Sequence, residues 1–101
     1  MSSYFEESGD KMTRQVALCA ALAQEMRVTR GLVEELAATL VADERFVMDY
    51  LDQLQAFDLI VQHVDESATL LDRVATGQDL DSAVDDVRLA VVQQRLRLAL
   101  G

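Results

Sequence analysis

No proline interrupts this chain of 101 residues, and only four glycines do so. Proline and glycine are the strongest breakers of helices and the usual residues of tight turns, which a fold of many short strands needs. Leu, Val and Ala supply most of the hydrophobic 50% of the chain, and aromatic residues make up only 5%. We therefore expect an all-α fold, organised as one domain with a single small core.

Acidic residues outnumber basic residues by 18 to 9, which gives a formal net charge of −9. Nucleic acid and anionic membranes attract positive surfaces, so this charge argues against both as general partners. The longest uninterrupted apolar run, residues 16–23, is far too short to span a bilayer. Cys19 is the only cysteine, so no intramolecular disulfide can form. Because the N-terminus also lacks a secretory signal pattern, we expect a cytoplasmic protein.

The first half of the chain shows two stretches with helical apolar spacing. Residues 1–9 are polar and contain three serines and a glycine, so we expect a flexible N-terminus before a single helical domain over residues 10–101. Asp10 is a candidate N-cap for the first helix. The apolar stripe of that helix includes Cys19, which we expect to be buried and unreactive. The pattern breaks at residues 28–31, and a second, short helix is expected after the break.

No glycine or proline marks a boundary between Asp43 and Gly77. Asp43 suits the N-cap of a third helix, and Gly77 is the clearest stop signal in the second half of the chain. The apolar run Leu-Ile-Val at residues 59–61 fits a short β segment near 59–64, but it equally fits the apolar stripe of one long helix over residues 43–75. Both interpretations remain open from the sequence alone.

The last expected helix, from about residue 79 to residue 99, is apolar on two opposite faces. At 100° per residue one face carries Leu80, Val84, Val87, Val91 and Leu98. The core of so small a domain covers one face only, so we expect the second face to pack against a second copy of the chain. Four residues on that second face are predicted to form the homodimer interface of a C-terminal dimerisation helix: Leu89, Val92, Leu96 and Leu100.

Residues 31–62, about a third of the chain, contain an ordered motif. Three groups follow one another along it: Glu35-Leu36-Ala37, then Phe46-Val47 with Tyr50-Leu51 and Leu54, then Leu59-Ile60-Val61. This order resembles the core of winged helix-turn-helix regulators, in which a helix of this "ELA" type leads through a short turn into a recognition helix and then a strand. The resemblance implies a small winged-helix-like domain that binds DNA. A plain helical bundle is the alternative architecture.

The charges in this motif differ from those of a DNA-binding surface. The recognition-helix positions that would face the major groove are Glu44, Arg45, Met48, Asp49 and Asp52. Carboxylates repel phosphate and have few partners on base edges. In addition, Asp58 replaces the usual turn glycine, and residues 62–67 would form an acidic wing. We therefore expect these five residues to bind a protein partner with a basic surface, and we regard DNA as the less favoured partner.

Signatures of catalysis and metal binding are sparse. His63 is the only histidine, and it is followed by Val64, Asp65 and Glu66, whose carboxylates would repel a phosphoryl group. One histidine and one cysteine cannot form a Cys/His metal cluster, and no glycine-rich phosphate loop occurs. We expect no catalytic residues, no metal and no cofactor. The predicted function is a homodimeric, non-catalytic regulatory module for protein–protein interaction, and the alternative is a winged-helix transcriptional regulator that binds DNA.

Overall fold

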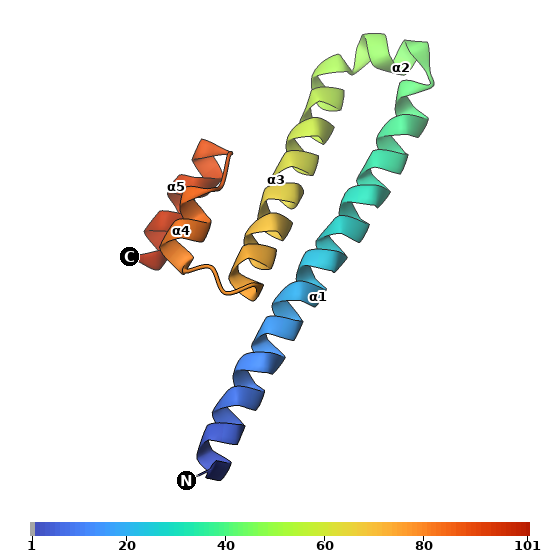
Figure 1. Ribbon diagram of the computed structural model, residues 1–101. Coiled ribbons are helices and arrows are strands. Elements are labelled where there is room, and N and C mark those ends of the chain that lie inside the picture. Colours follow the sequence, from blue (N-terminus) through green and yellow to red (C-terminus); the bar gives the residue numbers. More distant parts are fainter. Residues whose placement is uncertain (1) are drawn as a thin grey trace.

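The computed structural model describes the backbone of residues 2–101 and the side chains of residues 9–101. Within this range the chain forms helices and no strand: α1 (Ser2–Val41), α2 (Glu44–Asp49), α3 (Leu51–Ala75), α4 (Leu80–Asp85) and α5 (Ala90–Leu100). The predicted all-α class is therefore confirmed. α1 and α3 lie side by side as an antiparallel hairpin, α2 forms the turn at its closed end, and α4 and α5 lie along α3 on the side away from α1 (Figure 1).

α1 is a single helix of 40 residues. The break expected at residues 28–31 and the N-cap expected at Asp10 are both wrong, because the helix runs through each position. One glycine inside a helix costs only about 1 kcal/mol relative to alanine, and Arg30, next to Gly31, is held by an ion pair to Asp65 of α3. Met1 and the side chains of residues 2–8 lie outside the described part of the chain, and with them most of the segment expected to be flexible.

The β segment expected near residues 59–64 is also wrong, because this stretch lies inside α3. Four apolar residues recur through it at helical spacing, and all are half-buried: Leu54, Phe57, Val61 and Val64. A β-branched residue lowers helix propensity by less than about 1 kcal/mol, so packing of this stripe along α1 decides the conformation. The alternative of one helix over residues 43–75 holds for most of its length, but Tyr50 separates α2 from α3.

One expected cap and one expected stop are present, together with a cap at Asp79 that the sequence analysis did not predict. The Asp43 carboxylate accepts hydrogen bonds from the backbone N–H groups of Arg45 (3.0 Å) and Phe46 (3.2 Å), and so begins α2. Asp79 begins α4 in the same way, through the N–H of Ser82. Gly77 follows the end of α3 with φ at +97°, a conformation that favours glycine. The cap at Asp43 and the stop at Gly77 therefore agree with the sequence prediction.

The continuous helix expected over residues 79–99 is wrong, because the chain turns between α4 and α5. The side-chain amide of Gln93 donates hydrogen bonds to the backbone carbonyls of Val84 (3.2 Å), Asp85 (2.9 Å) and Val87 (3.3 Å). Carbonyls at the C-terminal end of a helix have no partner within the helix. A side chain from α5 therefore caps α4, which stabilises the turn between them.

The hairpin encloses very little core. Among the described side chains six are buried, and four of these lie in or between α4 and α5. α1 and α3 contribute one alanine each, Ala23 and Ala68. Cys19, which was expected to be buried, is only partly covered, because α3 ends at Ala75 and leaves the N-terminal half of α1 without a neighbour (Figure 1).

The shape of the chain differs from that of a compact monomer. The radius of gyration is 18.2 Å, whereas about 13 Å is typical of a compact chain of this length. The accessible surface is 7674 Å², whereas a folded monomer of this mass exposes about 5700 Å². The chain by itself therefore leaves about 2000 Å² more surface in water than its size requires.

Two glycine-to-alanine substitutions probe opposite kinds of backbone position. An added Cβ at Gly31, inside α1, meets nothing within 4 Å, so Gly31→Ala should stabilise the fold by about 0.5–1 kcal/mol through helix propensity. Gly77→Ala should destabilise it by about 1–2 kcal/mol, since L side chains rarely adopt a positive φ. Urea unfolding followed by circular dichroism measures both changes. A Gly77→Ala variant as stable as the unmodified chain would contradict the geometry at the end of α3.

Asp79 makes the stability of the fold depend on pH. The hydrogen bond from the Ser82 backbone N–H holds the pKa of the Asp79 carboxyl below its ordinary value. Such a group stabilises the fold above its ordinary pKa, and the contribution is lost as the pH falls through the lowered folded-state pKa. Asp79→Ala should therefore lower the urea midpoint at pH 7 and have a smaller effect near pH 2. An equal decrease of the urea midpoint at pH 7 and near pH 2 would show that the charge of the Asp79 carboxylate does not contribute to the stability.

Candidate protein-interaction site

The five residues predicted to bind a partner lie together at the closed end of the hairpin. Four belong to α2 and one to the first turn of α3, and all are exposed: Glu44, Arg45, Met48, Asp49 and Asp52. The rings of Phe46 and Tyr50 pack with their centroids 4.8 Å apart, which ties α2 to the start of α3. We call the surface formed by these five exposed residues the acidic apex.

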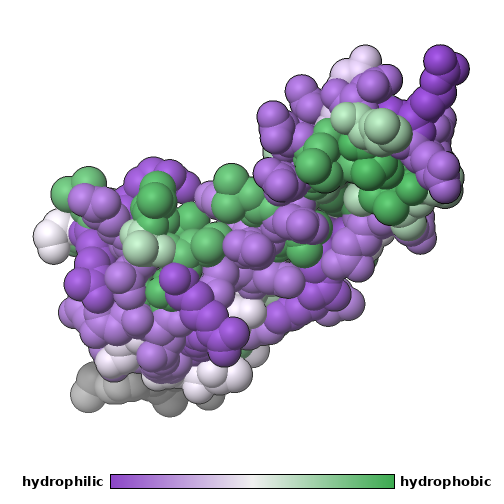
Figure 2. Space-filling view, turned by 90° about the horizontal axis from the view of Figure 1, so that it is seen from above, coloured by the Kyte–Doolittle hydropathy of each residue, from purple (hydrophilic) through white to green (hydrophobic). Residues whose placement is uncertain are grey.

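Apolar side chains are exposed at the same end of the molecule. Val41, Tyr50 and Leu51 surround α2 and are all exposed, and Met48 is 83% exposed. Figure 2 looks onto this end and shows a group of hydrophobic side chains at the right of the view, bordered by hydrophilic ones. An apolar centre with a polar rim is the usual anatomy of a protein–protein interface. α2, with six residues, is too short to cover these apolar side chains.

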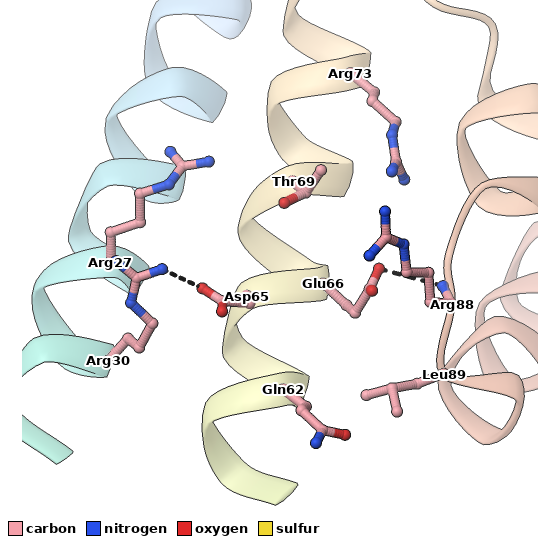
Figure 3. Close-up of a pocket in the computed structure, with 9 residues that line it drawn as sticks. All are labelled: Arg27, Arg30, Gln62, Asp65, Glu66, Thr69, Arg73, Arg88 and Leu89. Atoms are coloured by element: carbon pink, nitrogen blue, oxygen red, sulfur yellow. Dashed lines mark hydrogen bonds and ion pairs between the residues drawn. The ribbon is translucent and has the colours of Figure 1, made fainter. Parts of the chain in front are cut away.

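A polar cleft of about 550 Å³ lies between α1, α3 and the segment that joins α4 to α5 (Figure 3). On the α1 side, Arg30 Nη1 lies 2.6 Å from Asp65 Oδ1, and Arg27 Nη2 lies 2.5 Å from Asp72 Oδ2. The hydrogen bond to Asp65, together with the charge of that carboxylate, raises the pKa of the Arg30 guanidinium. The two arginines of this wall are therefore neutralised by carboxylates of α3.

The opposite wall of the cleft joins α3 to α4 and α5. The Glu66 carboxylate accepts a hydrogen bond from the backbone N–H of Arg88 (3.2 Å), and the Arg73 guanidinium donates to the Ala83 carbonyl (3.4 Å). In Figure 3 the guanidinium groups of Arg73 and Arg88 point toward each other beside Glu66. Arginine stays charged at physiological pH and does not act as a general base. We therefore interpret the cleft as the place where ion pairs and hydrogen bonds join the helices.

The residues predicted to form the dimer lie mainly against their own chain. One is buried, two are half-buried and one is exposed: Val92, then Leu89 and Leu96, and then Leu100. Leu96 and Leu100 line an apolar cavity of about 200 Å³ together with side chains of α3 and α4. The face that was expected to enter the core exposes Val91 and, at 77%, Leu98. The turn between α4 and α5 thus changes which face of the last helix meets α3, and Val92 is not accessible to a second copy.

A row of exposed leucines along α1 was missed by the sequence reasoning. These side chains are 61%, 45%, 62% and 53% exposed, for Leu18, Leu22, Leu32 and Leu36 respectively. Single exposed apolar residues are normal, whereas repeated ones on one helix mark an interaction surface. The signal was present as two pairs with a spacing of four residues, but the expected break at residues 28–31 assigned the pairs to different helices.

Comparisons with protein-family models, with curated proteins and with solved structures found no match for this chain. None of the helices that the structure describes combines the length and the apolar content needed to cross a bilayer. Across residues 9–101, no three or more His, Cys, Asp or Glu side chains are grouped so that they could hold a metal ion. The functional inference therefore depends on the surfaces of the chain itself.

The ion pair between Arg27 and Asp72 can be tested by a double-mutant cycle. Partly exposed pairs contribute about 0.2–1 kcal/mol, so the coupling between Arg27→Gln and Asp72→Asn should fall in that range. It should decrease in 1 M NaCl, where screening is strong. Arg95→Gln with Asp49→Asn, two exposed residues on α5 and α2, serves as the uncoupled control. A coupling of zero between Arg27→Gln and Asp72→Asn, equal to that of the control, would show that the Arg27–Asp72 pair does not form in solution.

Proposed function

We propose that this chain is a non-catalytic, homodimeric regulatory module that binds a partner protein through the acidic apex. The observation that carries the proposal is the joint exposure of acidic and apolar side chains on one end of the hairpin. Glu44, Asp49 and Asp52 supply negative charge, and Met48 is the most exposed large apolar side chain of the described residues. Covering Met48 with a partner removes apolar surface from water, which favours association.

The charge of the apex indicates the kind of partner. Complementary charge accelerates association with a basic protein surface, and like charge opposes the approach of nucleic acid. Affinity comes mainly from apolar and aromatic side chains at the centre of an interface, whereas rim charges set the association rate and the specificity. The surface that fits the acidic apex is therefore a basic one with an apolar hollow that accepts Met48.

The apex is also organised before any partner arrives. Asp43 caps α2 through two backbone hydrogen bonds, and the packed rings of Phe46 and Tyr50 hold α2 against α3. A surface held in one conformation loses less conformational entropy on binding than a flexible loop does. This favours recognition by a preformed shape and charge pattern.

The non-catalytic part of the proposal is supported by the chemistry of the polar cleft. Its titratable side chains are four arginines and two carboxylates, and its only hydroxyl belongs to Thr69. Arg30 and Asp65 are engaged with each other, and Glu66 accepts a backbone hydrogen bond. Nucleophilic catalysis needs a nucleophile with a base in hydrogen-bond reach, and the residues that line this cleft supply no such pair.

Site-specific photo-crosslinking in the native cells tests the partner-binding surface. A benzophenone amino acid in place of Met48 should form adducts with a small number of proteins whose contact surface is basic. Asp49→Arg with Asp52→Arg should reduce the adduct yield at least about fivefold, because the charge complementarity is reversed. The fold should persist in this variant, since both side chains are exposed.

The matched control is Glu35→Arg with Asp58→Arg, which changes the net charge equally at exposed positions away from the acidic apex. This variant should retain the adducts. An equal loss in both variants would indicate general electrostatics and contradict a specific site. Gel-shift titration of the unmodified chain with mixed duplex DNA at near-physiological salt should show no binding. A salt-dependent shift with sequence preference would replace the proposal with a DNA-binding regulator.

A further inference from the structure

α1 carries a second apolar stripe that its own hairpin does not use. At 100° per residue, Leu18, Leu22, Leu32 and Leu36 fall within about 80° of one another around the helix. Arg27 and Arg30, which pair with α3, lie about 150° away on the other flank. The exposed leucines therefore occupy the flank of α1 that faces away from the ion pairs and from the polar cleft.

The stripe has the spacing of a coiled-coil seam. Six residues separated by 4, 3, 4, 3 and 4 positions form it: Leu18, Leu22, Glu25, Thr29, Leu32 and Leu36. A repeat of 3.5 residues with apolar side chains is the pattern by which one helix packs along another. We call these six residues the leucine seam.

The leucine seam reads the same in both directions along α1. Its midpoint lies between Glu25 and Thr29, so a two-fold axis there aligns two copies of α1 in opposite directions. Leu18 of one copy then meets Leu36 of the other, Leu22 meets Leu32, and Glu25 meets Thr29. A parallel alignment would place Glu25 beside Glu25, and two like charges in a seam repel each other. The sequence of the seam therefore favours the antiparallel arrangement.

The same register brings opposite charges together at the ends of the seam. Continued by one heptad step in each direction, it aligns Gln15 with Thr39 and Lys11 with Asp43. The N-terminal end of α1 as a whole is not basic, because residues 2–14 hold Glu6, Glu7 and Asp10 as well as Lys11 and Arg14. The register therefore adds one pair of opposite charges, Lys11 with Asp43, at each end of the seam.

The length difference between α1 and α3 supports the same arrangement. Arg27 pairs with Asp72, and α3 ends three residues later at Ala75, so nothing of α3 faces the N-terminal part of α1. Met12, Val16 and Leu18 of this overhang are exposed. In an antiparallel pair the overhang lies along the hairpin of the other copy, and Leu18, which belongs to the seam, gains a neighbour there.

The area available is that of a stable dimer. Obligate homodimers bury about 2000–5000 Å² in total. The surface of this chain in excess of a compact monomer is about 2000 Å² per copy. For two copies this makes about 4000 Å² in total, in the upper part of that range. On α3, Ile60 is exposed and lies about 130° around the helix from Asp65 and Asp72, which pair with α1. The second helix of the hairpin therefore adds apolar area to the flank that carries the leucine seam.

We propose that two copies of this chain dimerise antiparallel through the leucine seam of α1, so that two hairpins form a four-helix bundle. The inference depends on the homodimer of the proposed function and assigns its interface to α1 in place of the C-terminal helix. The occupant of the exposed flank is a second copy, because the apolar spacing of the seam is complementary to itself and the excess surface matches the area that a stable dimer buries.

Disulfide crosslinking in a Cys19→Ser background tests the register and the direction. Glu25→Cys and Thr29→Cys chains, one carrying a size tag, are co-expressed, purified and oxidised with oxidised glutathione. If the seam is antiparallel, the disulfide that joins a Glu25→Cys chain to a Thr29→Cys chain should form in severalfold excess over a disulfide between two copies of either variant. An excess of Glu25→Cys and Thr29→Cys homodimers over the dimer that joins the two variants would overturn the antiparallel arrangement.

Light scattering at micromolar concentration tests the seam independently. The unmodified chain should return twice the chain mass, and Leu22→Glu with Leu32→Glu should return the chain mass itself. The matched control is Val91→Glu with Leu98→Glu, two exposed positions on α5, which should remain dimeric. Circular dichroism on the same samples reports whether helix content is retained.

The outcomes separate this inference from the proposed function. A monomeric unmodified chain would overturn both the seam and the homodimer. A dimer that resists Leu22→Glu with Leu32→Glu and gives no mixed disulfide would overturn the seam alone. If the seam variant loses its helices, the crosslinking experiment still decides. The photo-crosslinks from Met48 report the partner surface in every case.

Discussion

The pairing of α1 with α3 is the contact on which the rest of the structure depends. Two helices that cross once along their length bury one stripe from each and cannot enclose a core. Here that stripe is bordered on one flank by the Arg27–Asp72 and Arg30–Asp65 ion pairs, which fix the register of the hairpin. α4 and α5 are together too short to cover both flanks, and they pack on α3 alone (Figure 1). Because α4 and α5 pack on α3, no helix of the same chain covers the flank of α1 that carries the leucine seam.

Local signals in the sequence predicted the features that depend on neighbouring residues. The capping carboxylate at Asp43 and the stop at Gly77 each act through backbone groups within three residues, so a short stretch contains all the necessary information. The all-α class followed from the scarcity of breakers. Features decided at longer range were not predictable in this way. Gln93 caps α4 across the turn between the two helices, and Arg27 and Arg30, which join α1 to α3, have their partners more than thirty residues away.

The candidate sites also differ in whether they depend on neighbouring residues or on contacts between distant parts of the chain. The acidic apex was identified because its residues are adjacent in the chain, and the structure leaves them adjacent in space. The two opposite apolar faces were predicted for one continuous C-terminal helix, and the turn between α4 and α5 changed which face is free. The leucine pairs of α1 become one seam only when the helix is continuous through Gly31. A single weak helix former, read as a boundary, was enough to hide that surface.

In the proposed antiparallel dimer, the length of α1 would set the distance between two bound partner proteins. A helix of 40 residues spans about 60 Å, and an antiparallel pair carries one acidic apex at each end, pointing in opposite directions. Two sites that diverge cannot both engage one small protein, so they bring no chelate gain in affinity on a single target. They instead connect two separate molecules, or two distant points of one large assembly, at a fixed spacing. The proposed dimer would then be a rigid spacer, and the distance along α1 from the centre of the leucine seam to the acidic apex would set its reach.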